Sequence, residues 1–197
     1  MSERAPTVEA MDLLARLQST TSSPEERELL AVARHALLFI TSTGQRYAFT
    51  DFLQDLESNA PPTVVNAFDT REEAMNWLRQ HPAPPDSALV LVAGRYHVVL
   101  YSRENNHRHL TPLPVIEYHL GRLRRAGLSP AVATFQTREE ADAWLGRQSA
   151  PPRQAIITIA DEPFLAVFHP NVAHRALHPF ALARDEEEPD ESEPSPP

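Results

Sequence analysis

The sequence predicts an α+β fold built from a tandem duplicated α-β-α-β-β module with a period of 67 residues. Two observations predict this fold. The chain matches itself without a gap when it is shifted by that period, and both copies have the same order of helix and strand patterns. A long gapless match indicates gene duplication and equivalent folds for the copies. Because three strands and a helix form a thin core alone, we expect the two copies to form one pseudo-symmetric domain.

The predicted chain has four parts. An N-terminal helical segment covers residues 1–45, and the two copies of the module cover residues 46–113 and 114–184. The last part, residues 185–197, is acidic and rich in proline and has no aromatic residue. This composition is typical of chain that cannot bury a core, so we expect a disordered acidic tail.

The N-terminal segment has the pattern of two helices. Val8 to Leu17 is weakly amphipathic, and Ser23-Pro24-Glu25-Glu26 is a helix start with a serine N-cap and a proline at the first helical position. The second helix is expected to run to about Ile40, where Ser42-Thr43-Gly44 ends it. Its apolar residues recur every three or four positions and form one face: Leu30, Ala33, Leu37 and Ile40.

The strongest match between the copies is a short strand followed by a helix start. The strands end at Phe68 and Phe135, and the helix starts are Thr70-Arg71-Glu72-Glu73-Ala74 and Thr137-Arg138-Glu139-Glu140-Ala141. A threonine with a glutamate three residues later is a capping box, which explains the shared carboxylates without catalysis. The helix that follows has one apolar face in each copy, which places the two tryptophans in the core: Ala74, Trp77 and Leu78, and Ala141, Trp144 and Leu145.

Each module is predicted to begin with an amphipathic helix and to end in a β-hairpin. The helices are expected at Phe49–Glu57 and Ile116–Arg125. Short loops between apolar runs favour hairpins, and these runs are Ala88–Val92 with His97–Tyr101 and Ala155–Ile159 with Phe164–Phe168.

The copies also share a His-Arg pair in a segment expected to be a loop. His107-Arg108 in the first copy aligns with His174-Arg175 in the second. One interpretation is a pair of equivalent sites, each offering a cation and a hydrogen-bond donor to an anion or carboxylate. The alternative is a structural role, in which the side chains cap strands or pair with nearby acidic residues.

A basic cluster lies on the helix that links the copies. It consists of Arg122, Arg124 and Arg125. The simplest interpretation is a solvated helix face. The alternatives are a binding site for the acidic tail or for an acidic partner.

The segment Phe-x-Thr-Arg-Glu-Glu-Ala, which follows the short strand in both copies, resembles the opening of a peptidoglycan-binding SPOR repeat. The resemblance covers about a dozen residues per copy, a length that includes the strand. The later hairpin and the 67-residue period depart from that family, so its function is not carried over.

Several classes of chemistry are excluded or disfavoured by composition. The chain has no cysteine, and all 18 of its basic residues are arginine, which also indicates a high-GC bacterial source. It contains no Gly-rich nucleotide motif and no nucleophile elbow, so we expect no cofactor and name no catalytic residue. The spacing of His107 and His109, and of His174 and His178, suits a metal, but the two copies do not share it, so no metal site is expected.

The remaining expectations concern partners and location. Seven acidic residues of the tail account for most of the net charge of -9, so the body is nearly neutral and no nucleic-acid partner is expected. No apolar run is long enough to span a bilayer and no signal peptide is present, so we expect a cytoplasmic protein without membrane contact.

These observations lead to one leading hypothesis and two alternatives. The leading hypothesis is a non-enzymatic protein-binding module of the immunity, antitoxin or adaptor type, with homodimer formation by strand-edge pairing as a further expectation. The first alternative is a sensor of a small anion. It would have a cleft between the copies in which Arg108 and Arg175 bind the anion. The second is an enzyme with a dispersed His/Arg site that uses His107 or His174 as its base.

Overall fold

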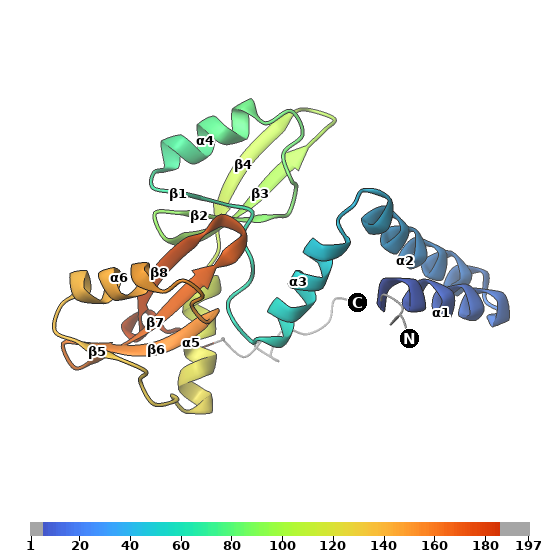
Figure 1. Ribbon diagram of the computed structural model, residues 1–197. Coiled ribbons are helices and arrows are strands. Elements are labelled where there is room, and N and C mark those ends of the chain that lie inside the picture. Colours follow the sequence, from blue (N-terminus) through green and yellow to red (C-terminus); the bar gives the residue numbers. More distant parts are fainter. Residues whose placement is uncertain (1–5, 186–197) are drawn as a thin grey trace, which may run out of the picture. The chain divides into compact units, whose positions relative to one another are not determined.

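The computed structural model describes residues 6–185 of the 197 and divides into two compact units. The first unit ends at Glu57 and the second begins at Ser58. Figure 1 shows helices alone in the first unit and a mixture of helices and strands in the second. The predicted disorder of the tail falls on residues 186–197, which lie outside the described part of the chain.

The first unit consists of three helices: α1 (Pro6–Thr20), α2 (Pro24–Ser42) and α3 (Arg46–Glu57). Helices α1 and α2 pack against each other (Figure 1). The Ser23 side chain caps α2 by accepting a hydrogen bond from the Glu26 N–H at 3.3 Å, and the chain turns at Gly44 with φ of 74°. The two predicted N-terminal helices are therefore confirmed, as are the start and the end of the second, whereas α3, the predicted first helix of the first module, lies in this unit.

The second unit contains two four-stranded sheets of the same topology. The first sheet is β1 (Asn66–Phe68), β2 (Leu89–Val92), β3 (Arg95–Ser102) and β4 (His107–Pro112). The second is β5 (Thr134–Phe135), β6 (Gln154–Ile159), β7 (Glu162–His169) and β8 (His174–Pro179). In each sheet the first two strands are parallel and the other neighbours are antiparallel. The predicted duplication is thus present in the fold.

One helix crosses each sheet, and a further helix links the copies. The first sheet carries α4 (Arg71–Gln80) and the second carries α6 (Arg138–Arg147), as Figure 1 shows. The linking helix is α5 (Val115–Ala126). Two short 3₁₀ helices, η1 (Pro170–Val172) and η2 (Phe180–Leu182), flank β8.

The structure adds a fourth strand to each predicted module. The His-Arg pairs, which were expected in a loop, are the first residues of β4 and β8, so that expectation was wrong. The sequence gives little indication of β4, because Leu110 is the one buried residue of this strand. Its apolar and polar residues therefore do not alternate.

Both hairpins turn in two residues. Ala93 and Gly94 have φ values of 48° and 73°, and Ala160 and Asp161 have φ values of 48° and 66°. Positive φ at both central residues is the mirror-image type I turn, whose twist matches that of the paired strands. The same turn therefore sets the register of the hairpin in both copies.

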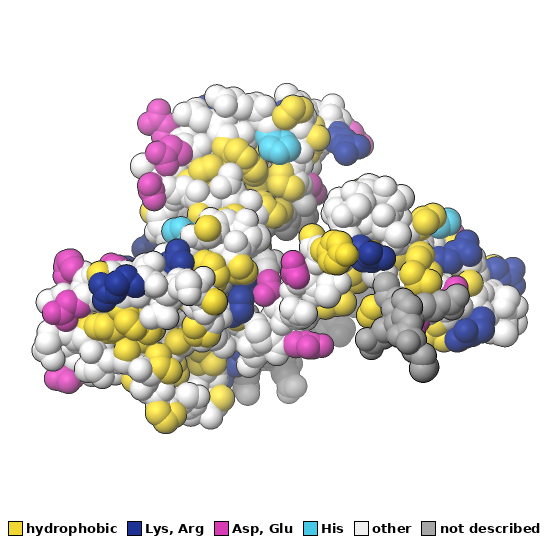
Figure 2. All heavy atoms as spheres, viewed as in Figure 1, with side chains coloured by type: hydrophobic (Ala, Val, Ile, Leu, Met, Phe, Trp, Pro, Cys, Tyr) yellow, Lys and Arg dark blue, Asp and Glu magenta, His cyan; other side chains and the backbone are white. Residues whose placement is uncertain are grey.

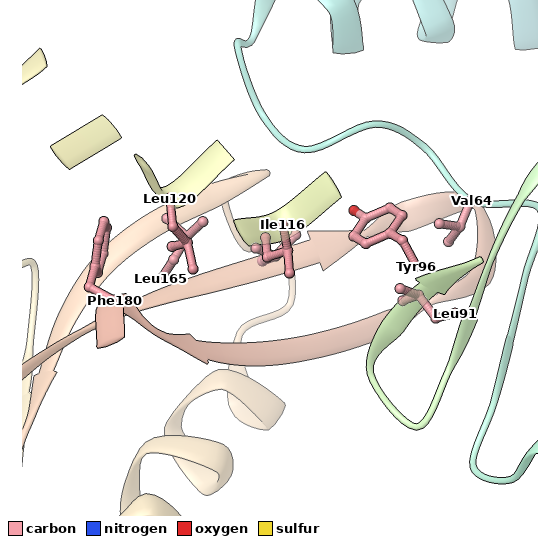
Figure 3. Packing of buried hydrophobic residues seen from close by; sticks show 8 residues of the cluster. Val64, Leu91, Tyr96, Ile116, Leu120, Leu165 and Phe180 are labelled. Carbon is pink, nitrogen blue, oxygen red and sulfur yellow. The ribbon is translucent and has the colours of Figure 1, made fainter. Parts of the chain in front are cut away.

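Three apolar clusters form the core of the second unit. Helix α4 buries one against the first sheet, and α6 buries its counterpart against the second. The third cluster joins the copies through side chains from both sheets, α5, η2 and the segment before β1 (Figure 3): Val64, Leu91, Tyr96, Ile116, Leu120, Leu165, Val167 and Phe180. This shared cluster supports the prediction that the two copies form one domain.

Candidate functional site

The Arg108 side chain is hydrogen-bonded to the end of a helix. Its guanidinium donates hydrogen bonds to the backbone oxygens of Leu78 (2.8 Å) and Arg79 (2.5 Å) in the last turn of α4. It also lies over the Tyr101 ring, 5.5 Å from the centroid. Helix carbonyls without an intrahelical partner need such donors, so Arg108 caps α4.

Arg175 does the same in the second copy. It donates to the Gln148 carbonyl at 3.1 Å, just after α6, and lies 5.0 Å from the centroid of the Phe168 ring. The paired arginines thus share a structural geometry, and neither of them lines the two hollows described below. The hydrogen bonds of both arginines therefore favour a structural role over an anion site. The acceptors are carbonyls at helix ends, whereas the sequence suggested strand ends or acidic side chains.

The two histidines of the pairs lie in different environments. His107 is exposed and its ring stacks on that of His109 at a centroid distance of 6.2 Å. His174 is half-buried beside His169, and burial lowers the pKa of His174, while the Asp69 carboxylate opposes that change. The histidines are therefore not two copies of one site.

The basic cluster on α5 divides into two parts. Arg124 and Arg125 both reach the carboxylate of Asp185, at 3.3 and 3.5 Å. The backbone N–H of Arg184 donates to the Glu117 carbonyl at 2.9 Å, so the chain before Asp185 runs along α5. This geometry supports the interpretation in which these two arginines hold the beginning of the acidic tail.

Arg122 enters a different hydrogen-bond chain. Its Nη2 lies 2.9 Å from Nδ1 of His119, and because a guanidinium has no acceptor, Nδ1 must accept. The His119 proton is then on Nε2, which donates to Gln154 Oε1 at 2.8 Å. Gln154 Nε2 in turn donates to the Asn59 carbonyl at 3.1 Å. The chain of bonds therefore fixes a neutral His119 of known tautomer.

The surroundings of His119 agree with this protonation state. The residue is only 6% exposed, and burial is the main reason that its pKa is lowered. The hydrogen bond to Gln154 opposes this change, and the positive charge of Arg122 adds to it. His119 was not among the residues selected from the sequence, where a single histidine in an amphipathic helix gives no signal.

A cavity of about 280 Å³ opens beside this network. Pro62 precedes the first sheet and the other lining residues belong to α5, so the cavity lies at the junction of the two copies: Pro62, Val115, Tyr118, His119 and Arg122. We call it the junction cavity. It combines one cation, one neutral imidazole, one phenol and two apolar walls.

A second hollow, of about 450 Å³, lies along the edge strand β1 and helix α4. Phe68 and Trp77 line it, with ring centroids 5.4 Å apart. The equivalent pair Phe135 and Trp144 has nearly the same geometry, at 5.5 Å. Both tryptophans are half-buried and pack against the module cores, as expected from their place on the apolar helix faces.

The first unit presents apolar side chains to solvent. None of the apolar side chains of α1, α2 or α3 is buried within the described residues. Leu29, Val32 and Phe39 of α2 are 70%, 62% and 60% exposed, and Tyr47 of α3 is 74% exposed. Figure 2 shows such side chains among the charged ones on the surface of these helices.

Comparisons with known proteins identify no relative. The chain matches no protein-family model, no curated protein and no solved structure. Among the helices of residues 6–185, none has the length and hydropathy of a membrane-spanning segment. In the same part of the chain, no group of three or more histidine or acidic side chains is placed to hold a metal ion.

Proposed function

We propose that this protein is a non-enzymatic, adaptor-type binding module that uses the outer face of α2 to dock an amphipathic helix of a partner protein. The observation that supports it is a stripe of exposed apolar side chains on this helix. Leu29, Val32, Ala36 and Phe39 are spaced by three and four residues, so they share one face. We call these four residues the α2 stripe.

The other face of α2 already has a partner within the chain. Leu30, Leu37 and Thr41 are half-buried, and they lie on the side opposite the α2 stripe, where α1 packs. A helix with apolar residues on two faces buries both only when it has two neighbours. Contiguous exposed apolar surface on a protein marks an interaction site, and helix-on-helix docking is a recurring solution.

Charge indicates which partner helix fits. Glu25, Glu26 and Glu28 precede the α2 stripe in the first turns of the helix and are exposed. A partner helix with basic side chains beside its apolar face would place them against these carboxylates. Charges at the rim of such an interface contribute mainly to the association rate and to specificity.

The test is an affinity capture from a lysate of the source organism with three forms of the full chain. The first is the unaltered protein and the second is a Val32→Glu/Phe39→Glu double variant. The control is Leu38→Glu, since Leu38 lies off the stripe and is similarly exposed at 52%. We expect a protein that binds the unaltered chain and the control in near-equal amount and is lost from the double variant.

Direct measurement with that protein then completes the test. A synthetic helix of the captured protein should bind the unaltered chain at least tenfold more tightly than it binds the double variant. Retention by the double variant contradicts the proposed surface. Self-association of the unaltered chain in sedimentation, lost in the double variant, would make a second copy the occupant and overturn the heterologous partner.

A further inference from the structure

We propose that the junction cavity binds a small organic carboxylate, with Arg122 as the residue that reads the carboxylate group. The inference is independent of the α2 stripe. It rests on the charge of Arg122, on the bonds that hold it and on the chemistry of the cavity walls.

Arg122 carries a charge that no acidic side chain compensates within the described residues. The three arginines of this part of α5 differ in this respect, because Arg124 and Arg125 are paired with Asp185. The single described hydrogen bond of Arg122 is to the neutral ring of His119. A guanidinium has five N–H donors, so most of its donors are free to meet a ligand.

The position of Arg122 is set before any ligand arrives. His119 is held by Gln154, and Gln154 is held by the Asn59 carbonyl, so the acceptor for Arg122 belongs to a fixed chain of hydrogen bonds. Asn59 has a φ of 52°, and this left-handed turn directs its carbonyl toward Gln154. A preorganised donor costs less to engage than a free surface side chain, which favours binding.

The walls of the junction cavity determine the size and polarity of the rest of the ligand. Val115 and Pro62 offer apolar surface, and Tyr118 offers a ring and a phenol. A volume of about 280 Å³ lies just below the roughly 300–1,000 Å³ that is typical of drug-sized ligands, so the ligand is small. One cation beside a neutral imidazole balances one negative charge. A monocarboxylate with a compact apolar body fits better than a phosphate dianion, and its two oxygens match the fork of arginine.

The experiment titrates benzoate and, separately, inorganic phosphate into the full chain at constant ionic strength, with calorimetry and thermal unfolding as readouts. The variants are Arg122→Gln and, as the matched control, Arg124→Gln on the same helix. Arg122 is exposed, so its substitution leaves the core intact. We expect saturable benzoate binding that raises the Tm, at least tenfold weaker binding by R122Q, and unchanged binding by R124Q.

Each other outcome overturns the proposal. No saturable benzoate binding by the unaltered chain means that the cavity does not hold a carboxylate of this size. Equal binding by the R122Q variant means that the anion is read elsewhere. Phosphate binding as tight as benzoate binding, and equally lost in R122Q, assigns the cavity to phosphate and not to a carboxylate.

Discussion

The two copies of the module are alike where each folds by itself and unlike where they meet. All six buried apolar residues beneath α4 have a buried apolar equivalent beneath α6, 67 positions later. In the cluster that joins the copies, buried residues of the first copy have exposed equivalents in the second. Buried Tyr96 corresponds to exposed Pro163, and buried Val64 to exposed Ala131. The two copies therefore share the core residues within each module. They differ in the residues that join the two modules into one domain.

Two buried histidines at the meeting surface also have no histidine equivalent in the other copy. His169 and His178 of the second sheet are 0% and 5% exposed, whereas their equivalents in the first sheet are Ser102 and Thr111. Burial, and then neighbouring positive charges, lowers the pKa of His169 to about 3 and that of His178 to about 4. The second copy thus carries two buried histidines whose pKa values lie well below the ordinary value, at positions where the first copy has no titratable side chain.

The largest predicted effect follows from these histidines. In the unfolded chain a histidine has a pKa near 6.5, so below that pH the unfolded state binds more protons than the folded state. Stability should be unaffected by them above pH 6.5 and should fall toward pH 4 by on the order of 3 kcal/mol for each of the two histidines. Urea unfolding at pH 7 and pH 4.5 measures this loss.

Replacing each histidine by the residue of the first copy sharpens the result. The His169→Ser/His178→Thr variant should lose less stability than the unaltered chain between those two pH values, whatever its stability at pH 7. Acidic residues titrate in both proteins, so the difference between them isolates the histidines. An identical pH dependence of the two proteins would contradict the prediction.

The next largest effect concerns a glycine that the first copy lacks. A Cβ on Gly121 would lie 1.8 Å from the carbonyl oxygen of Arg184, in the segment that packs against α5. Gly121→Ala should displace this segment, remove the Arg184 bond to Glu117 and disturb buried Phe180. We expect a loss of about 2–3 kcal/mol, as for other overpacked sites.

Gly146 in α6 is the matched control. A Cβ there meets no atom within 4 Å. Gly146→Ala should be neutral or stabilising by up to about 1 kcal/mol, because alanine is the better helix former. Equal effects at the two glycines, measured by thermal unfolding, would mean that the segment on α5 adjusts without cost.

A smaller effect tests the likeness of the copies. Arg108→Ala and Arg175→Ala should each destabilise the protein by about 1–2 kcal/mol, because each leaves helix-end carbonyls without a donor. Exposed Arg103 is the control, and Arg103→Ala should change stability by less than about 0.5 kcal/mol. If the paired arginines instead serve a ligand, their loss would leave the unfolding midpoint near that of the control.

The sequence predicts local features of this fold well, since their causes lie within a few residues. The helix starts at Ser23, Thr70 and Thr137 follow from side-chain capping, and the module helices follow from apolar spacing. The role of Arg108 was not predictable in this way, because its acceptors lie 29 and 30 residues earlier in the chain. Capping across a fold leaves no local pattern.

The residues of the junction cavity could not be predicted from the sequence for a related reason. A repeat comparison selects residues that the copies share, whereas His119 and Gln154 align with Phe52 and Ser87, with which they share no chemistry. The sequence identified Arg122 as part of a basic cluster, but its separation from the two arginines that hold Asp185 depends on helix faces and on the path of a distant segment.

The smallest predicted effect concerns the two helix starts, which are alike in sequence but differ in their hydrogen bonds. Glu73 accepts from the N–H groups of both Asp69 and Thr70 at 3.2 Å, whereas Glu140 accepts from the N–H of Gln136 at 3.0 Å. Glu73→Ala should cost about 1 kcal/mol and Glu140→Ala about half as much, since only the first removes a reciprocal capping box.

Urea unfolding of both variants at pH 7 measures this difference, with Glu72→Ala as a control for removing a carboxylate from the same first turn. The E72A variant retains the charge and bonds of Glu73, so its effect should be the helix-dipole contribution alone, a few tenths of a kcal/mol. Equal losses for E73A and E140A would mean that the two capping arrangements are energetically the same, and that the copies have diverged at their meeting surface but not at their helix starts.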